Sequence, residues 1–150
     1  MQNRPMRVCV LLLALLLPMA ALADLSPALQ KALSDSKFVY ISSTRKDGSL
    51  SKPAEIWFLF HDGAVYVGTR PSSWRVKRIK AGRPGAKIAV GSVDGPSFQA
   101  TGSLVNDPSA QELMLKTYAQ KYPEGWQTHA QAFRDGFKDG GRVLVKYAPK

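Results

Sequence analysis

Apolar and polar residues alternate in short runs along most of this chain, which is typical of antiparallel β-strands. Asp-Gly pairs follow several of these runs, and this dipeptide suits tight hairpin turns because both residues tolerate a positive φ. The pairs Asp47-Gly48, Asp62-Gly63 and Asp94-Gly95 therefore predict hairpins. The strands expected from the pattern are Phe38–Thr44, Pro53–Phe60, Ala64–Thr69, Lys87–Val93, Ser97–Val105 and Gly141–Tyr147.

The segment Ile56–Phe60 departs from this alternation because every residue in it is apolar. Such a strand is expected to be buried on both faces. Closure of a small antiparallel sheet into a barrel would cover one face, and a helix or a second subunit must then cover the other. Because the chain has few helices to spare, the segment favours a homodimer.

Helical periodicity fills the gaps between the predicted strands. Proline suits the first turn of a helix, and serine before an amphipathic stretch suits its cap. A short amphipathic turn is expected to begin at Ser26-Pro27. The helices expected after the first strands cover Trp74–Ala81, run from Asp107-Pro108 to Pro123 and cover Gln127–Phe137. The resulting order β-β-β-α-β-β-α-α-β predicts an α+β, mostly β fold with six strands. It lacks the regular strand-helix alternation of a parallel dinucleotide-binding sheet.

Residues 1–23 have the pattern of a secretory signal peptide. Arg4 and Arg7 precede the apolar run Val8–Leu17, and Ala21-Leu22-Ala23 matches a small-x-small cleavage site. The run is about half of the ~20 residues that a membrane span requires, so no stable membrane anchor is expected. The predicted mature protein, 24–150, is a single periplasmic or secreted domain, and it has no cysteine because Cys9 lies in the leader.

The basic residues are concentrated in one stretch. The chain contains 21 Lys+Arg against 11 Asp+Glu, yet no acid occurs from Gly63 to Val93, and seven basic residues lie between Arg70 and Lys87. A uniformly basic surface would favour nonspecific binding of nucleic acid. One short basic stretch beside a strand end instead predicts a pocket for a small anion such as phosphate. No nucleic-acid partner is expected, because only Trp74 interleaves this stretch with an aromatic ring.

The residues that follow the strand Ala64–Thr69 carry the chemistry that phosphate binding needs. Thr69 ends the strand, Ser73 precedes the next helix, and Arg75 lies in the first turn of that helix. Hydroxyl groups, free backbone amides and a guanidinium can converge there on one phosphate. The alternative is that Ser73 only caps the helix while the arginines cover a solvated face.

Four pieces of the chain resemble, in order, the FMN-binding split barrels of the pyridoxamine 5′-phosphate oxidase-like superfamily. They are Asp47-Gly48 with Pro53–Phe58, then Asp62–Thr69, then Ser73–Ile79, and finally Thr101-Gly102. The likeness is greatest to small members related to general-stress and deazaflavin-dependent proteins. It implies a six-stranded antiparallel split β-barrel with flanking helices, and a homodimer that holds the FMN cofactor between its subunits.

The resemblance also implies which residues bind the cofactor. Its candidates are Lys52 and Trp57 along the isoalloxazine ring, Thr69, Ser73 and Arg75 at the phosphate, and Lys77 as a weaker phosphate ligand. One departure is informative: the Arg-Gln-Val-Arg-like strand of true pyridoxamine phosphate oxidases is replaced here by Ser97–Ala100. This replacement argues against that specific activity.

Two classes of function fit these residues. The first is an exported FMN-binding protein, which would be an FMN-dependent oxidoreductase if it is an enzyme, because the cofactor would carry the reaction. The second is a non-catalytic binding protein that uses the basic pocket for another anionic ligand or partner, such as anionic lipid head groups. His61 and His129 are too few and too far apart to predict a metal site.

Overall fold

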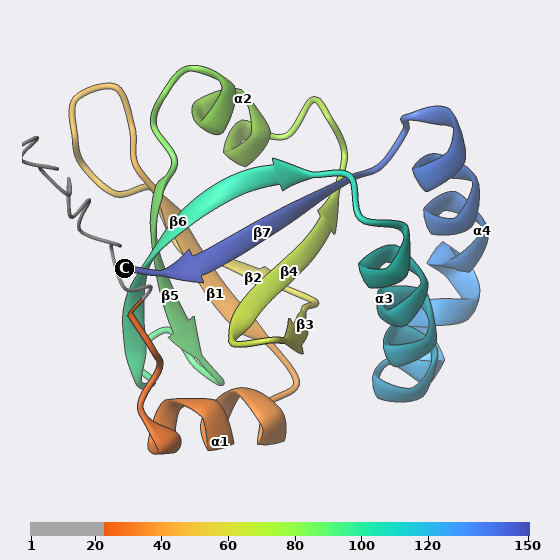
Figure 1. Cartoon of the computed structure of the whole chain (residues 1–150), viewed down its shortest axis with the longest axis horizontal. Coiled ribbons are helices and arrows are strands. Elements are labelled where there is room, and N and C mark those ends of the chain that lie inside the picture. Colours follow the sequence, from red (N-terminus) through yellow and green to blue (C-terminus); the bar gives the residue numbers. More distant parts are fainter. Residues whose placement is uncertain (1–22) are drawn as a thin grey trace, which may run out of the picture.

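Seven antiparallel strands form one curled sheet in the computed structural model, which describes residues 23–150 (Figure 1). The strands are β1 (Val39–Ser43), β2 (Ala54–Ile56), β3 (Leu59–His61), β4 (Ala64–Thr69), β5 (Gly85–Val90), β6 (Ser97–Val105) and β7 (Val143–Pro149). Their spatial order is β2-β1-β5-β6-β7-β4-β3. The predicted mostly β, antiparallel architecture is confirmed, whereas the predicted number of six strands is wrong.

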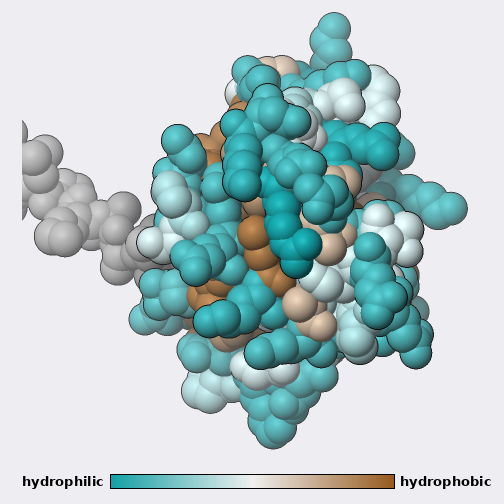
Figure 2. Space-filling view, turned by 90° about the vertical axis from the view of Figure 1, so that its right-hand side faces the viewer, coloured by the Kyte–Doolittle hydropathy of each residue, from teal (hydrophilic) through white to brown (hydrophobic). Residues whose placement is uncertain are grey.

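Four helices within the described residues surround the sheet: α1 (Pro27–Asp35), α2 (Trp74–Lys80), α3 (Pro108–Lys121) and α4 (Pro123–Asp139). Helices α1 and α2 lie at opposite ends of the barrel, whereas α3 and α4 pack together against one flank (Figure 1). Helix α4 begins earlier than predicted because Pro123, which follows the end of α3, fills its first position. Seen from the side of α3 and α4, the surface is mostly hydrophilic (Figure 2).

The seventh strand arises because the predicted strand Pro53–Phe60 is two strands, β2 and β3, at opposite edges of the sheet. The chain crosses between the edges at Trp57 and Phe58, which take no part in the strand ladder. Tyrosine hydroxyls bind the backbone there instead. The Tyr118 hydroxyl donates to the Trp57 carbonyl at 2.9 Å, and the Phe58 amide donates to the Tyr122 hydroxyl at 3.1 Å. These partners lie on and just after α3, far along the chain.

Strand β4 is buried on both faces and separates two apolar cores. Val65 and Val67 face the interior of the barrel, whereas Ala64 and Tyr66 face α3 and α4. The hairpin that leads into β4 turns at Asp62-Gly63, where φ is 47° and 70°, and this confirms the predicted Asp-Gly turn. The end of β4 is therefore held from both sides where it reaches Thr69.

The predicted leader falls almost wholly outside the described residues, so its cleavage after Ala23 stays a prediction. Within residues 23–150, no helix has both the length and the apolar character needed to cross a membrane.

Lys121 at the end of α3 predicts an unusual pH dependence of stability. Its Nζ lies 3.5 Å from the centroid of the Phe58 ring, and burial lowers its pKa from 10.5 to about 8. Between these two pKa values the unfolded chain binds more protons than the folded one, so stability is expected to rise as the pH rises from about 8 towards 10. Urea unfolding at several pH values measures this rise.

The matched control for this prediction lies on the same helix. Lys121→Met is expected to abolish the rise between pH 8 and 10, whereas Lys116→Met, at an exposed position of α3, is expected to leave it unchanged. Equal pH profiles for the two variants would contradict the assignment to Lys121.

Candidate functional site

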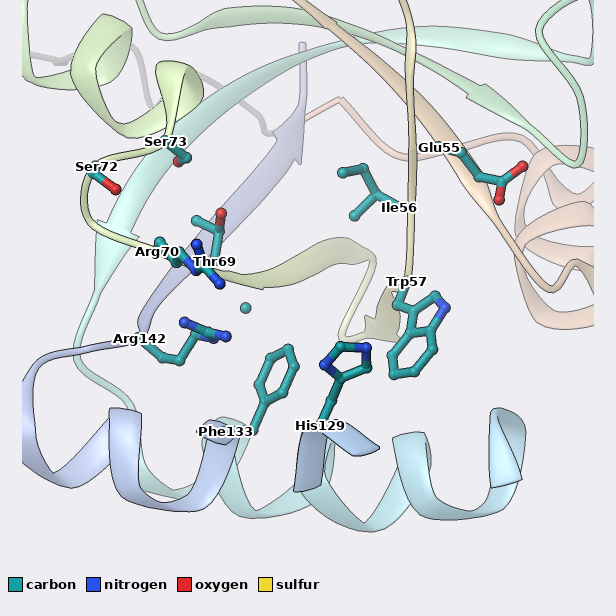
Figure 3. A pocket seen from close by; sticks show the side chains of 11 residues that line it. Glu55, Ile56, Trp57, Thr69, Arg70, Ser72, Ser73, His129, Phe133 and Arg142 are labelled. Atoms are coloured by element: carbon teal, nitrogen blue, oxygen red, sulfur yellow. The ribbon is translucent and has the colours of Figure 1, made fainter. Parts of the chain in front are cut away.

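A cavity of about 520 Å³ opens between β2, the end of β4 and the inner side of α4 (Figure 3). We call it the larger cavity, because a smaller one is described below. Ile56 lies on one side of it and Phe133 on the other, with Trp57 and His129 together at one end (Figure 3). The residues that line it are Glu55, Ile56, Trp57, Gly68, Thr69, Arg70, Ser72, Ser73, His129, Phe133 and Arg142.

Glycine at position 68 brings α4 close enough to β4 to form one wall of this cavity. A Cβ atom there would lie 2.7 Å from Cε1 of Phe133 and 3.0 Å from the Met114 sulfur. Both distances are too short for ordinary carbon contacts, so no larger residue fits without a shift of the helices. The Phe133 ring can therefore lie against the strand and present an apolar surface to the cavity.

Trp57 is fixed as a second apolar wall by the residues around it. Its indole stacks on Tyr122 with ring centroids 4.4 Å apart and an interplanar angle of 3°. The ring edge packs so closely on α4 that a Cβ at Gly125 would lie 2.7 Å from it. The His129 ring meets the same indole edge-on at 5.7 Å. A planar ligand would find these rings already ordered.

A smaller cavity of about 370 Å³ lies between α2, β1 and the loop before β2. Four cationic side chains line it, and no acid does. The cations are Arg45, Lys52, Arg75 and Arg78. Only Arg78 among them reaches the adjoining strand, where its Nη1 donates to the Ser43 hydroxyl at 2.9 Å. Thr69 and Ser73 line both cavities, so these two hydroxyl-bearing residues stand where the cavities meet.

Two buried donors at this junction have no hydrogen-bond partner among residues 23–150. They are the Ser73 hydroxyl and Nη1 of Arg75. Ser73 occupies the N-cap position of α2, yet its side chain makes no capping hydrogen bond. Because buried polar groups are nearly always paired, each of these donors is expected to have an acceptor. The Tyr147 hydroxyl, also buried and without a partner in the described residues, is one neighbour of Arg75. A phosphate oxygen meets the requirement for an acceptor.

The Arg75 side chain reaches from α2 towards the interior of the barrel. Burial raises the pKa of the Tyr147 hydroxyl, whereas the positive charge of Arg75 and the hydrogen-bond donors of its side chain, which lie beside that hydroxyl, oppose the shift. Neither of the two side-chain ion pairs in the described part of the chain involves Arg75. The guanidinium is thus a partly buried cation without a countercharge, which favours an anionic ligand.

Comparison with known proteins identifies a fold. No protein-family model and no curated protein matches the chain. Among solved structures, a candidate pyridoxamine 5′-phosphate oxidase from Listeria innocua has a TM-score of 0.58 over 82% of this chain and 91% of that one, with 17% identity. This chain has the pyridoxamine 5′-phosphate oxidase-like split-barrel fold. The resemblance seen in four short pieces of sequence is thus confirmed for the fold.

Other split barrels with this fold carry different names. An F420 reductase has a TM-score of 0.52 and 15% identity, over 81% of this chain and 92% of that one. HutZ, the heme storage protein of Vibrio cholerae, has a TM-score of 0.53 and 15% identity, over 85% of this chain and 92% of that one. Proteins named for different activities therefore share this fold, and the fold alone does not assign a ligand to this chain.

The split barrel brings most of the predicted cofactor residues together. Thr69, Ser73 and Arg75, the predicted phosphate ligands, all line the smaller cavity. Of the two residues predicted along the ring, Trp57 lines the larger cavity, whereas Lys52 lines the smaller one. Lys77 lines neither cavity. Its Nζ lies 4.9 Å from the ring centroid of Trp74, an exposed residue that does line the smaller cavity.

Several cavity residues were not anticipated from sequence. They are Arg70, Ser72, His129, Phe133 and Arg142, which come from the loop after β4, from α4 and from the start of β7. His129 is exposed, and its ring forms part of the cavity wall. Two signals were available in the sequence. The basic stretch that begins at Arg70 predicted an anion pocket, and helical periodicity placed Phe133 on a helix without indicating a ligand.

Proposed function

We propose that this protein binds FMN or a related planar cofactor that carries a phosphate. In this proposal the phosphate lies at the junction of the two cavities, between Thr69, Ser73 and Arg75. The observation that supports it most strongly is the pair of buried, unpartnered donors on Ser73 and Arg75. The cationic, acid-free lining of the smaller cavity supplies the charge that a phosphate requires.

The larger cavity fits the ring of such a cofactor. Ile56 and Trp57 provide an apolar wall that leads away from Thr69, and Phe133 provides another wall from α4. Bound FMN would supply hydride or electron transfer, while the protein would bind the phosphate, orient the ring and exclude water. An oxidoreductase is therefore the enzymatic form of this proposal.

A non-catalytic binding protein for another anionic ligand is the second candidate. It is favoured by HutZ, which has the same fold and is named as a heme storage protein. His129 at the cavity wall, together with the surrounding cations, would suit a planar anionic ligand other than FMN. Absorbance spectra of the purified protein distinguish a flavin from other bound chromophores.

Export and dimer formation are two further parts of the proposal. Export is supported by the leader pattern in residues 1–23, and the dimer by the resemblance, in which two subunits enclose the cofactor. The apolar segment Ile56–Phe60 supports the dimer less than expected, because Phe58 and Leu59 are buried by the chain's own core. Intact mass of protein from its native host and sedimentation velocity measure these two properties.

Arg75→Ala is expected to weaken FMN binding about ten- to a hundredfold, because a hydrogen bond to a charged group contributes roughly 1.5–3 kcal/mol. Riboflavin, which lacks the phosphate, is expected to bind the variant and the parent protein equally. Titration of flavin fluorescence with each protein measures both affinities. Ser73→Ala tests the same site with a smaller change and is expected to weaken FMN binding in the same direction.

The control is Lys80→Ala, which removes an exposed charge at the end of α2. If Lys80→Ala weakens FMN binding as much as Arg75→Ala, the basic stretch attracts FMN only through its overall positive charge. The specific phosphate site is then wrong. If the parent protein binds no FMN, the second candidate function replaces the first.

A further inference from the structure

Two arginines give the larger cavity a cationic end of its own. Arg70 follows β4 and Arg142 precedes β7, and both side chains line this cavity (Figure 3). Both guanidinium groups lie on the Thr69 side of the cavity, away from Trp57 (Figure 3). Neither arginine takes part in the two side-chain ion pairs found in residues 23–150.

Glu55, the one acid that lines the larger cavity, does not neutralise Arg70 and Arg142. Glu55 accepts a hydrogen bond from the Tyr40 hydroxyl at 2.7 Å, and its carboxylate points away from the two guanidinium groups (Figure 3). The cavity thus combines two cations with apolar rings, and it offers no internal countercharge.

The Arg142 side chain is held in place by three contacts. Its stem lies flat on α4 at Gly136, where a Cβ atom would be 2.5 Å from the Arg142 Cγ. Its guanidinium lies 5.2 Å from the centroid of the Phe133 ring. Its Nη1 donates to the Gly141 carbonyl at 3.2 Å, which leaves the other guanidinium donors for a ligand. Such preorganisation is expected of a binding residue and not of a mobile surface arginine.

These arginines are separate from the proposed phosphate ligands. Arg70 and Arg142 line the larger cavity and not the smaller one, whereas Arg75 lines the smaller cavity and not the larger one. A single phosphate beside Arg75 would therefore leave the half-buried Arg142 and the exposed Arg70 without an anionic partner. The larger cavity has room and charge for a second anionic group.

We propose that Arg70 and Arg142 form a second anion site, which binds the carboxylate of a small aromatic or conjugated acid against Phe133. A guanidinium pair matches the planar, two-oxygen shape of a carboxylate. The apolar body of the acid would lie along Phe133 on the α4 side of the cavity, opposite the Ile56 side along which the cofactor ring would lie. If the proposed function holds, this acid is the co-substrate beside the cofactor ring; the anion site itself does not depend on a cofactor.

Benzoate and its uncharged isostere benzamide test the site on the full-length mature protein without added cofactor. Nuclear magnetic resonance titration is expected to show benzoate binding at least tenfold more tightly than benzamide. Arg142→Gln and Arg70→Gln are each expected to weaken benzoate binding at least tenfold and to leave benzamide binding unchanged. Arg142→Lys keeps the charge but loses the planar guanidinium group. Its affinity for benzoate is expected to lie between that of the parent protein and that of Arg142→Gln.

Arg134→Gln is the matched control, because Arg134 is an exposed arginine of α4 that lines neither cavity. Thermal unfolding of each variant confirms that it is folded. Equal affinities for benzoate and benzamide would overturn the second anion site, as would equal losses in Arg142→Gln and Arg134→Gln. Loss of benzoate binding in Arg75→Ala but not in Arg142→Gln would overturn it too, since benzoate would then occupy the phosphate site.

The test also separates this inference from the proposed function. FMN affinity is expected to change less than twofold in Arg142→Gln. If the protein binds benzoate through Arg70 and Arg142 but binds no FMN, the anion site stands and the flavin proposal fails. If it binds FMN but shows no preference for benzoate over benzamide, the flavin proposal stands and the anion site is wrong.

Discussion

Replacing Phe58 by alanine is expected to lower the free energy of unfolding by about 3–5 kcal/mol. Phe58 is completely buried, with 0% exposure, in the core inside the barrel. It lies where the chain crosses between the two edges of the sheet, so the surrounding strands cannot easily collapse into the space it leaves. The substitution also removes the ring that faces Nζ of Lys121. Guanidinium chloride unfolding followed by circular dichroism measures the loss.

The neighbouring Phe60 provides the control for this prediction. It is only partly buried and lies on the edge strand β3. Phe60→Ala is therefore expected to cost clearly less than Phe58→Ala. Equal losses at the two positions would show that the crossing is no more rigid than the sheet edge beside it.

Tyr122→Phe is expected to lower the free energy of unfolding by about 2–4 kcal/mol. It leaves the buried Phe58 amide without a partner, at roughly 1–3 kcal/mol, and removes a part-buried hydrogen bond to the Lys37 carbonyl worth about 1 kcal/mol. The Tyr122 hydroxyl donates to the Lys37 carbonyl at 2.7 Å and accepts from the Phe58 amide at 3.1 Å. The phenyl ring that remains can still stack on Trp57. The expected loss is therefore one of hydrogen bonding, and denaturant unfolding measures it.

The pH dependence of the same variant gives an independent readout. Burial raises the pKa of Tyr122 from 10 to about 12, although the Phe58 amide opposes the shift. The stability that this shift represents is fully present below pH 10 and is lost as the pH rises from 10 to 12. Tyr122→Phe is expected to make this alkaline loss smaller. Tyr66→Phe, at a buried tyrosine without a hydroxyl hydrogen bond in the described residues, is the control.

Local sequence patterns predicted the parts of the fold that depend on neighbours in the chain. The turn at Asp62-Gly63 was predictable because its left-handed backbone is set by those two residues. The break at Trp57 was not predictable, because the Tyr118 and Tyr122 hydroxyls that bind it are 61 and 64 residues away. A run of apolar residues carries no mark of such distant partners.

The same distinction separates the two halves of the candidate site. Thr69, Ser73 and Arg75 lie within seven positions of each other, so a strand end followed by a helix was enough to bring them together. Phe133 reaches the cavity because α4 packs on β4 at Gly68, and Arg142 reaches it because β7 pairs with the end of β4. Tertiary packing places them, and neither residue has a distinctive neighbourhood in the sequence.

The crossing at Trp57 and Phe58 also bears on aggregation. Exposed sheet edges carry unpaired amide and carbonyl groups that can recruit strands from other molecules. Here both edge strands, β2 and β3, are three residues long, and one leads into the other through two residues. A strand from another molecule could therefore pair with only a few unpaired amide and carbonyl groups at either edge of the sheet. The segment that shapes the cavity therefore also protects the monomer from edge-to-edge assembly.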